Sequence, residues 1–230
     1  MSDSPQRTIT EQVQGQLRDM ILAGTLAPGS RIDQAEVAQR FGVSVVPVRE
    51  ALARLQSSGL VRIVPHRGAF VEALSVEELI DIYHVREVLE EQAARLAAPH
   101  LTNADLATLE DLERRMSVMI DAGDFDTFLD LNREMHFTIY RASGRRYLLQ
   151  IIGQLWDQST RYRRLHLHAA PERARTSMFE IHAVVDTARR RDADALGYIV
   201  RYKVHQTTVG LLERMQLAHP EANGRKLAIG

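Results

Sequence analysis

The sequence contains no cysteine among its 230 residues. This absence excludes disulfides, thiolate metal sites and cysteine nucleophiles. The sequence also lacks any apolar run near the roughly 18 residues that a membrane-spanning helix requires, and it lacks the pattern of a secretory signal peptide. We therefore expect a cytoplasmic protein that does not engage a membrane.

The chain has no overall excess of positive charge, because 29 lysines and arginines stand against 30 acidic residues, giving a formal net charge of −1. A nucleic-acid partner would therefore have to be attracted by a local patch. Residues 44–70 contain such a patch: four arginines against one glutamate leave a local charge of +3. A cluster of this kind is more often an ordinary solvated face, so the surrounding pattern decides its meaning.

Around this patch, the sequence has the pattern of a winged helix-turn-helix. It predicts a helix that Asp33 caps and Gly42 ends, and a second helix that begins at Ser44 and ends near Gly59. Two short apolar stretches within residues 60–71 then predict a β-hairpin with a basic tip. This order of elements binds duplex DNA, with the second helix as the recognition helix and the hairpin as the wing.

The pattern also predicts the rest of the fold. An amphipathic helix with Thr10 as its cap precedes the motif and completes a DNA-binding domain at residues 1–74. Residues 75–217 show helical periodicity without strand alternation, which predicts an all-α antiparallel bundle of about six helices. These predicted helices span residues 75–98, 102–121, 124–142, 146–168, 171–190 and 193–216, and Pro171 suits the first turn of the fifth. Residues 218–230 are expected to be a disordered tail.

Five sequence stretches resemble one family of proteins. They are LAPGSRIDQAEVAQRFGVSVVPVREALARLQSSGLV and RGAFV in the first domain, and YHVREVLEEQAARLAA, NREMHFTIYRASG and EIHAVVDTARRRDADALGYIVRYKVH in the second. Together they resemble the GntR superfamily of transcription regulators, in the FadR-like subfamily with an FCD C-terminal domain. The resemblance implies a homodimer that binds a palindromic operator in double-stranded DNA. It also implies repression until a small metabolite binds the helical domain.

The resemblance also implies a set of DNA-binding residues. They are Ser44, Val45, Val46, Pro47 and Arg49 on the recognition helix, and His66, Arg67 and Gly68 at the wing tip. Val45 stands where the family usually has an arginine that contacts guanine or phosphate, so we expect an operator that differs from the usual consensus. For Arg49, the structural alternative is a salt bridge within its own helix.

Three histidines lie on three different predicted helices: His136, His182 and His205. Each stands in a stripe that is largely apolar, the last one in the stripe Tyr198, Tyr202, His205, Val209 and Leu212. Such histidines are more often satisfied core residues, but all three match metal-ligand positions of the FCD pattern. The resemblance therefore implies a divalent metal ion, zinc or nickel. Asn132 replaces the usual aspartate ligand and is expected to be a weak fourth ligand or an orienting hydrogen-bond partner.

Arg86 matches a family position that can point toward the effector, where a guanidinium could clamp the carboxylate of a small organic acid. The alternative is a surface pair with Glu90, one helical turn away. Tyr83 and Tyr140 are candidate pocket walls, although tyrosines at such positions are more often core residues.

We therefore expect a metabolite-responsive transcription regulator rather than an enzyme. One alternative is a regulator in which the metal is itself the signal, or is purely structural. A second alternative is a metal-dependent hydrolase in which the three histidines activate water. The hydrolase is disfavoured because the sequence has neither an HExxH motif nor a nucleophile elbow.

Overall fold

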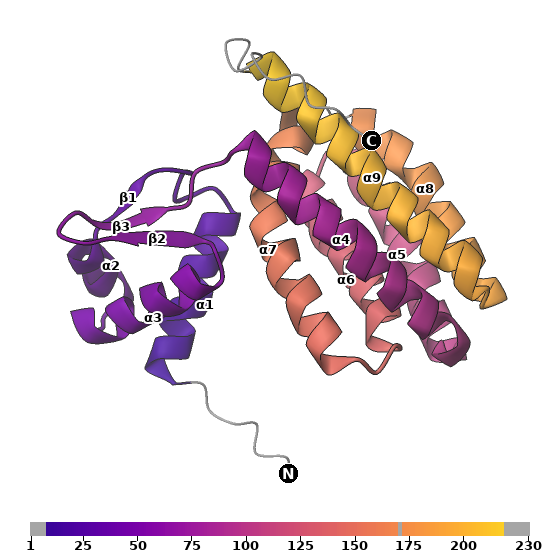
Figure 1. The fold of residues 1–230 in the computed structure, drawn as a ribbon, viewed down its shortest axis with the longest axis horizontal. Helices are drawn as coiled ribbons and strands as arrows, with labels where there is room; N and C mark the ends of the chain where they lie inside the picture. The colour runs from indigo at the N-terminus through magenta and orange to yellow at the C-terminus, as the bar shows by residue number, and fades with distance from the viewer. Residues whose placement is uncertain (1–7, 170–171, 219–230) are drawn as a thin grey trace. The chain divides into compact units, whose positions relative to one another are not determined.

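The computed structural model describes residues 8–169 and 172–218. The chain divides into two compact units, Met1–Ser75 and Val76–Gly230, and each is described by itself (Figure 1). The expected boundary at residue 74 lies one residue before this division. Pro171 and all but the first residue of the expected tail lie outside the described residues.

The N-terminal unit combines three helices with a small sheet, as the winged helix-turn-helix pattern predicts. The helices are α1 (Ile9–Leu22), α2 (Gln34–Phe41) and α3 (Val45–Ser57), and the strands are β1 (Arg31–Ile32), β2 (Val61–Val64) and β3 (Gly68–Val71). The sheet is antiparallel in the order β1-β3-β2, so the hairpin of β2 and β3 gains a third strand that the sequence did not predict.

The ends of the first two helices follow from local chemistry. The Asp33 carboxylate accepts hydrogen bonds from two backbone amides of α2, and Gly42 ends that helix with a left-handed φ of 66°. Helix α1 begins earlier than expected, because Thr8 rather than Thr10 forms the capping box, together with Glu11. The Thr10 hydroxyl instead donates a hydrogen bond to Glu50 on α3 (2.8 Å).

The second unit is entirely helical, as expected, and within the described residues the whole chain is 79% helical. It comprises α4 (Val76–Ala97), the short 3-10 helix η1 (Ala98–His100), α5 (Asn103–Ala122), α6 (Phe125–Arg141), α7 (Arg146–Ala169), α8 (Glu172–Arg190) and α9 (Ala193–Ala218). Thr102 forms a capping box at the start of α5, and Gly123 ends that helix with a φ of 73°. Asp124 and Asp192 cap the starts of α6 and α9.

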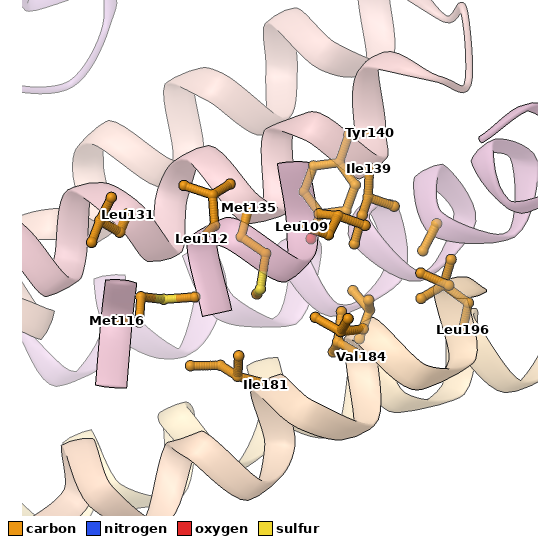
Figure 2. Packing of buried hydrophobic residues seen from close by; sticks show 14 of the residues in the cluster. Leu109, Leu112, Met116, Leu131, Met135, Ile139, Tyr140, Ile181, Val184 and Leu196 are labelled. Carbon is orange, nitrogen blue, oxygen red and sulfur yellow. The ribbon is translucent and has the colours of Figure 1, made fainter. Parts of the chain in front are cut away.

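Apolar side chains of α5, α6 and α8 form the centre of this bundle. Figure 2 shows Ile181 and Val184 of α8 directed toward Met116 of α5 and Met135 of α6. The inward face of α8 is thereby fixed, because burying these side chains provides most of the stabilisation that aligns an amphipathic helix. None of the helices in the described part of the chain is long and apolar enough to cross a membrane.

Candidate DNA-binding surface and effector cavity

Helix α3 presents one face to solvent and buries the other. Ser44, Val46 and Arg49 are exposed, whereas Val48 and Leu52 lie in the core of the N-terminal unit. Val45 and Pro47 are half-buried at the border between the two faces. The exposed face is the one that a recognition helix needs, because its side chains can reach base edges in the major groove.

The start of α3 is unusual in its hydrogen bonding. Ser44 occupies the N-cap position, but its hydroxyl makes no capping hydrogen bond, and the first turn of α3 contains no acidic residue. By contrast, the Asp33 carboxylate occupies the same position on α2. The first amides of α3 and the positive end of its dipole therefore suit a phosphate group.

Arg49 is held by the neighbouring helix rather than by a salt bridge within α3. Its Nε donates a hydrogen bond to the side-chain oxygen of Gln34 on α2 (3.1 Å). This contact fixes the direction of the guanidinium and leaves its two terminal amino groups for a further partner. Sequence reasoning missed Gln34, since it stands on a different helix, 15 residues earlier.

The positive charge of the patch is less available than the sequence count suggests. Arg54 lies 3.9 Å from Glu11, and Arg62 lies 3.8 Å from Glu72. Exposed pairs such as these contribute little stability, but each carboxylate offsets the charge of its arginine. Arg49 instead bonds to the neutral side chain of Gln34, and no ion pair within the described residues offsets its charge.

The wing tip exposes His66 and Arg67, and His66 adopts a left-handed φ of 61°. Gly68 follows with a φ of 103°, and a Cβ there would lie 3.4 Å from Nε of Arg31. Arg31 belongs to β1, which pairs with β3 and thus adds a third basic side chain beside the wing. Strand β1 leaves little signal in the sequence, because a strand of two residues is too short to show a periodicity.

In the helical unit, the structure does not bring the three histidines together. His136 is buried on α6, with Nδ1 2.9 Å from the Tyr140 hydroxyl. The side chain of His182 is 75% exposed on α8 and lies 2.8 Å from Glu113 on α5. The side chain of His205 is 44% exposed on α9 and lies 3.0 Å from Glu87 on α4.

This placement corrects the choice of helix face at His182 and His205. On α8, the buried residue is Ile181, and the adjacent His182 points away from the core. On α9, the buried residues include Lys203 and Val204, whereas Tyr198 and Tyr202 of the expected stripe are exposed. His205 stands two residues after Lys203, which turns it about 200° around the helix.

The residues do not fit the metal centre that the sequence predicted. Among the described residues, no three His, Cys, Asp or Glu side chains form a group that could hold a metal ion. The amide oxygen of Asn132 instead accepts a hydrogen bond from Nζ of Lys203 (3.0 Å). A buried ammonium group at this place would repel a divalent cation.

Arg86, Tyr83 and Tyr140 do come together, but inside the bundle. Arg86 and Glu90 form the pair that the sequence offered as an alternative, although it is buried rather than on the surface (Nε to Oε1, 2.6 Å). The Tyr140 hydroxyl donates to the other oxygen of Glu90 (2.6 Å), and the guanidinium of Arg86 lies over the rings of Tyr83 and Trp156.

Charge and burial set the protonation of this cluster. Burial acts to lower the pKa of Arg86, but the charge and hydrogen bond of Glu90 outweigh it and raise that pKa above its usual value. Burial, followed by the charges of Lys203 and Arg86, lowers the pKa of His136 well below its usual value. His136 is therefore neutral near pH 7. Because the Tyr140 hydroxyl donates its proton to Glu90, Nδ1 of His136 is the donor in its hydrogen bond with Tyr140.

A cavity of about 40 Å³, partly open to solvent, lies between α6, α7, α8 and α9. Its lining consists of Phe128, Leu129, Asn132, Arg163, Leu167, Arg173, Ser177, Lys203 and Thr207. Burial lowers the pKa of Lys203 to about 8 and that of Arg163 to about 10. Neither residue stood out in the sequence as a ligand-binding candidate, because a cation within an apolar stripe looks like an interruption of the buried face.

Together, a winged helix-turn-helix with an exposed recognition helix and a helical unit with an internal cavity define a DNA-binding transcription regulator. The model for bacterial regulatory proteins of the gntR family matches residues 9–71, and that for the FCD domain matches residues 81–205. The chain belongs to the GntR family and carries an FCD domain.

Relatives agree with this assignment. The HTH-type transcriptional regulator McbR of Escherichia coli K12 is 34% identical over 149 residues, covering 65% of this chain and 67% of that protein. The HTH-type transcriptional repressor RspR of the same strain is 28% identical over 195 residues, or 84% of each chain. The solved structure of E. coli McbR/YncC has a TM-score of 0.82 at 27% identity, covering 91% of this chain and all of that one. The family and these relatives are transcription regulators, not enzymes.

Proposed function

We propose that this regulator is a repressor that binds a palindromic operator as a homodimer and releases it when a small organic acid occupies the helical unit. The observation that carries the proposal is the cavity, in which no carboxylate of the described residues lies within ion-pair distance of the buried cations Lys203 and Arg163. Buried cations are ordinarily paired, so an anionic ligand is the partner that this site fits.

The N-terminal unit supports the homodimer. Its exposed recognition face offers few strong contacts, chiefly the guanidinium of Arg49 and the basic wing tip at His66 and Arg67. Two such units on adjacent half-sites would multiply this modest affinity through their effective concentration. A two-fold dimer would then require a palindromic operator. The relative RspR is itself named a repressor, which favours repression over activation.

Selection of binding sites from random duplex DNA tests the proposal directly. We expect the full chain to enrich a palindrome whose half-sites lie about one helical turn, or ~10 base pairs, apart. Addition of small carboxylates should then release the purified protein from that site, because a ligand shifts an equilibrium by its different affinity for the two states. Enrichment of an unpaired half-site, or tighter DNA binding with every carboxylate, would contradict the proposal.

Replacement of Arg49 with alanine should weaken operator binding by about 5- to 150-fold, because a bidentate arginine contact contributes about 1–3 kcal/mol of discrimination. The measurement is a mobility-shift titration of the selected operator. Arg190→Ala is the matched control, since this exposed arginine at the end of α8 lies in the other unit and pairs with Asp186. If Arg49→Ala bound the operator as tightly as the unchanged protein, Arg49 would not be a DNA-contacting residue.

A further inference from the structure

We infer that the ammonium group of Lys203, rather than a metal ion, anchors the carboxylate of the effector in the cavity of the helical unit, with Arg163 as the second cation. The inference rests on the proposed function, in which this cavity binds an organic acid. It adds the chemistry by which the acid is held, and it makes effector binding independent of divalent metal.

Lys203 has unused hydrogen-bonding capacity where it faces the cavity. It is 6% exposed, and its Nζ donates one hydrogen bond, to Oδ1 of Asn132 on α6 (3.0 Å). An ammonium group has three donors, so two remain for a ligand. Since Asn132 is neutral, the positive charge of Lys203 is left for the carboxylate.

Arg163 supplies the second cation from α7. It is 7% exposed, its guanidinium lies 4.0 Å from the centre of the Trp156 ring, and one terminal amino group donates to Thr160 (3.2 Å). Its Nε is buried and has no hydrogen-bond partner among the residues that the structure describes. An unsatisfied buried donor is costly, and a ligand oxygen in the cavity would satisfy it.

The other residues that line the cavity limit the charge and the size of the ligand. Arg173 adds no net charge, because both oxygens of Glu180 pair with it at 2.9 and 3.1 Å. Two uncompensated positive charges therefore remain, beside the apolar side chains of Phe128, Leu129 and Leu167. The cavity itself is small, with a volume of about 40 Å³, and it is partly open to solvent. These features fit a small mono- or dicarboxylic acid with a short apolar part.

The same contact argues against a metal ion as the anchor. The amide oxygen of Asn132, which the sequence offered as a weak metal ligand, accepts a hydrogen bond from Lys203. A divalent cation near that oxygen would face an ammonium group across a poorly solvated cavity, where repulsion between like charges is strong. A carboxylate placed there is attracted by the same charge.

Isothermal titration calorimetry on the untagged full chain, prepared in EDTA, tests the inference. The probes are propionate, benzoate and succinate, each compared with its neutral amide. We expect at least one carboxylate to bind with EDTA present and its amide to bind at least tenfold more weakly. Lys203→Met and Lys203→Gln should each weaken that carboxylate at least tenfold, and Lys203→Gln keeps a polar group next to Asn132. Arg201→Met, an exposed charge on the same helix, is the control and should leave affinity unchanged.

The outcomes separate this inference from the proposed function. If a carboxylate binds only after zinc or nickel is restored, or if folded Lys203→Met and Lys203→Gln bind it as tightly as the unchanged protein, Lys203 is not the anchor and the proposed function stands. If none of the carboxylates binds with or without metal, the organic-acid function itself is overturned. Circular dichroism of each variant confirms that it is folded.

Discussion

Replacing Arg86 with methionine should lower the free energy of unfolding of the helical unit by about 3–5 kcal/mol, because the change leaves the Glu90 carboxylate buried without its cation. Glu90 would keep only the hydrogen bond from the Tyr140 hydroxyl. Urea unfolding of the full chain, followed by far-ultraviolet circular dichroism, measures the loss. Unfolding within about 1 kcal/mol of the unchanged protein would contradict a buried, dry ion pair.

Two further variants test whether the loss of stability comes from breaking the ion pair between Arg86 and Glu90. Arg86→Met combined with Glu90→Gln should recover a large part of the stability, because neither charge is then left unpaired. Arg190→Met breaks an exposed pair of the same i,i+4 spacing, with Asp186, and should change stability by less than about 0.5 kcal/mol. If the double variant is no more stable than Arg86→Met, packing of the arginine against Trp156 outweighs its charge.

Replacing Lys203 with methionine should have the opposite effect and raise the free energy of unfolding of the helical unit by about 2 kcal/mol at pH 7. Burial lowers the pKa of Lys203 from 10.5 to about 8, and at about 1.36 kcal/mol per pKa unit the charged form costs roughly 3 kcal/mol. Loss of the hydrogen bond to Asn132 destabilises the variant by about 1 kcal/mol and so offsets part of this gain. The variant that loses carboxylate affinity should therefore be the more stable protein, as is common where a site holds a strained group.

The pH dependence of this difference follows from the direction of the pKa shift. Below pH 8 the folded protein holds the charged ammonium and bears the full cost. As pH rises from about 8 toward 10.5, Lys203 loses its proton more readily in the folded state than in the unfolded state, so the unchanged protein gains stability relative to Lys203→Met. The charges that face Lys203, chiefly Glu180, Arg173, Arg163 and Glu90, are present in both proteins. Thermal melts of both across pH 7–10 should converge, and a constant gap would contradict the lowered pKa.

Much of the fold could be predicted because its signals are local. Asp33 and Gly42 bound α2 as the sequence predicts, and Thr102 and Asp124 cap α5 and α6 at the residues where those helices were expected to begin. Gly42 and Gly123 both have a left-handed backbone. A cap or a glycine turn depends on residues within one turn of the chain, so its chemistry is visible in a short stretch. The error at Thr10 shows the limit, because Thr8 offers the same hydroxyl two residues earlier.

The effector cavity could not be predicted as well, because its residues meet only after the helices have packed. On α9, the tyrosines at 198 and 202 and the buried residues at 200 and 204 give two apolar stripes, and periodicity alone does not say which one turns inward. Packing of α9 selects the stripe that contains Lys203. The sequence interpretation followed the aromatic stripe, which led to His205 and away from the lysine.

The uncapped start of α3 should open more readily than the capped start of α2. Its first backbone amides lack the side-chain acceptor that Asp33 gives α2, so in the free protein they should exchange their hydrogens with water faster than those of α2. A DNA phosphate at this position would supply the missing acceptor. The first turn of the recognition helix should therefore slow its exchange when operator is bound, so that part of the binding free energy appears as local order in the protein.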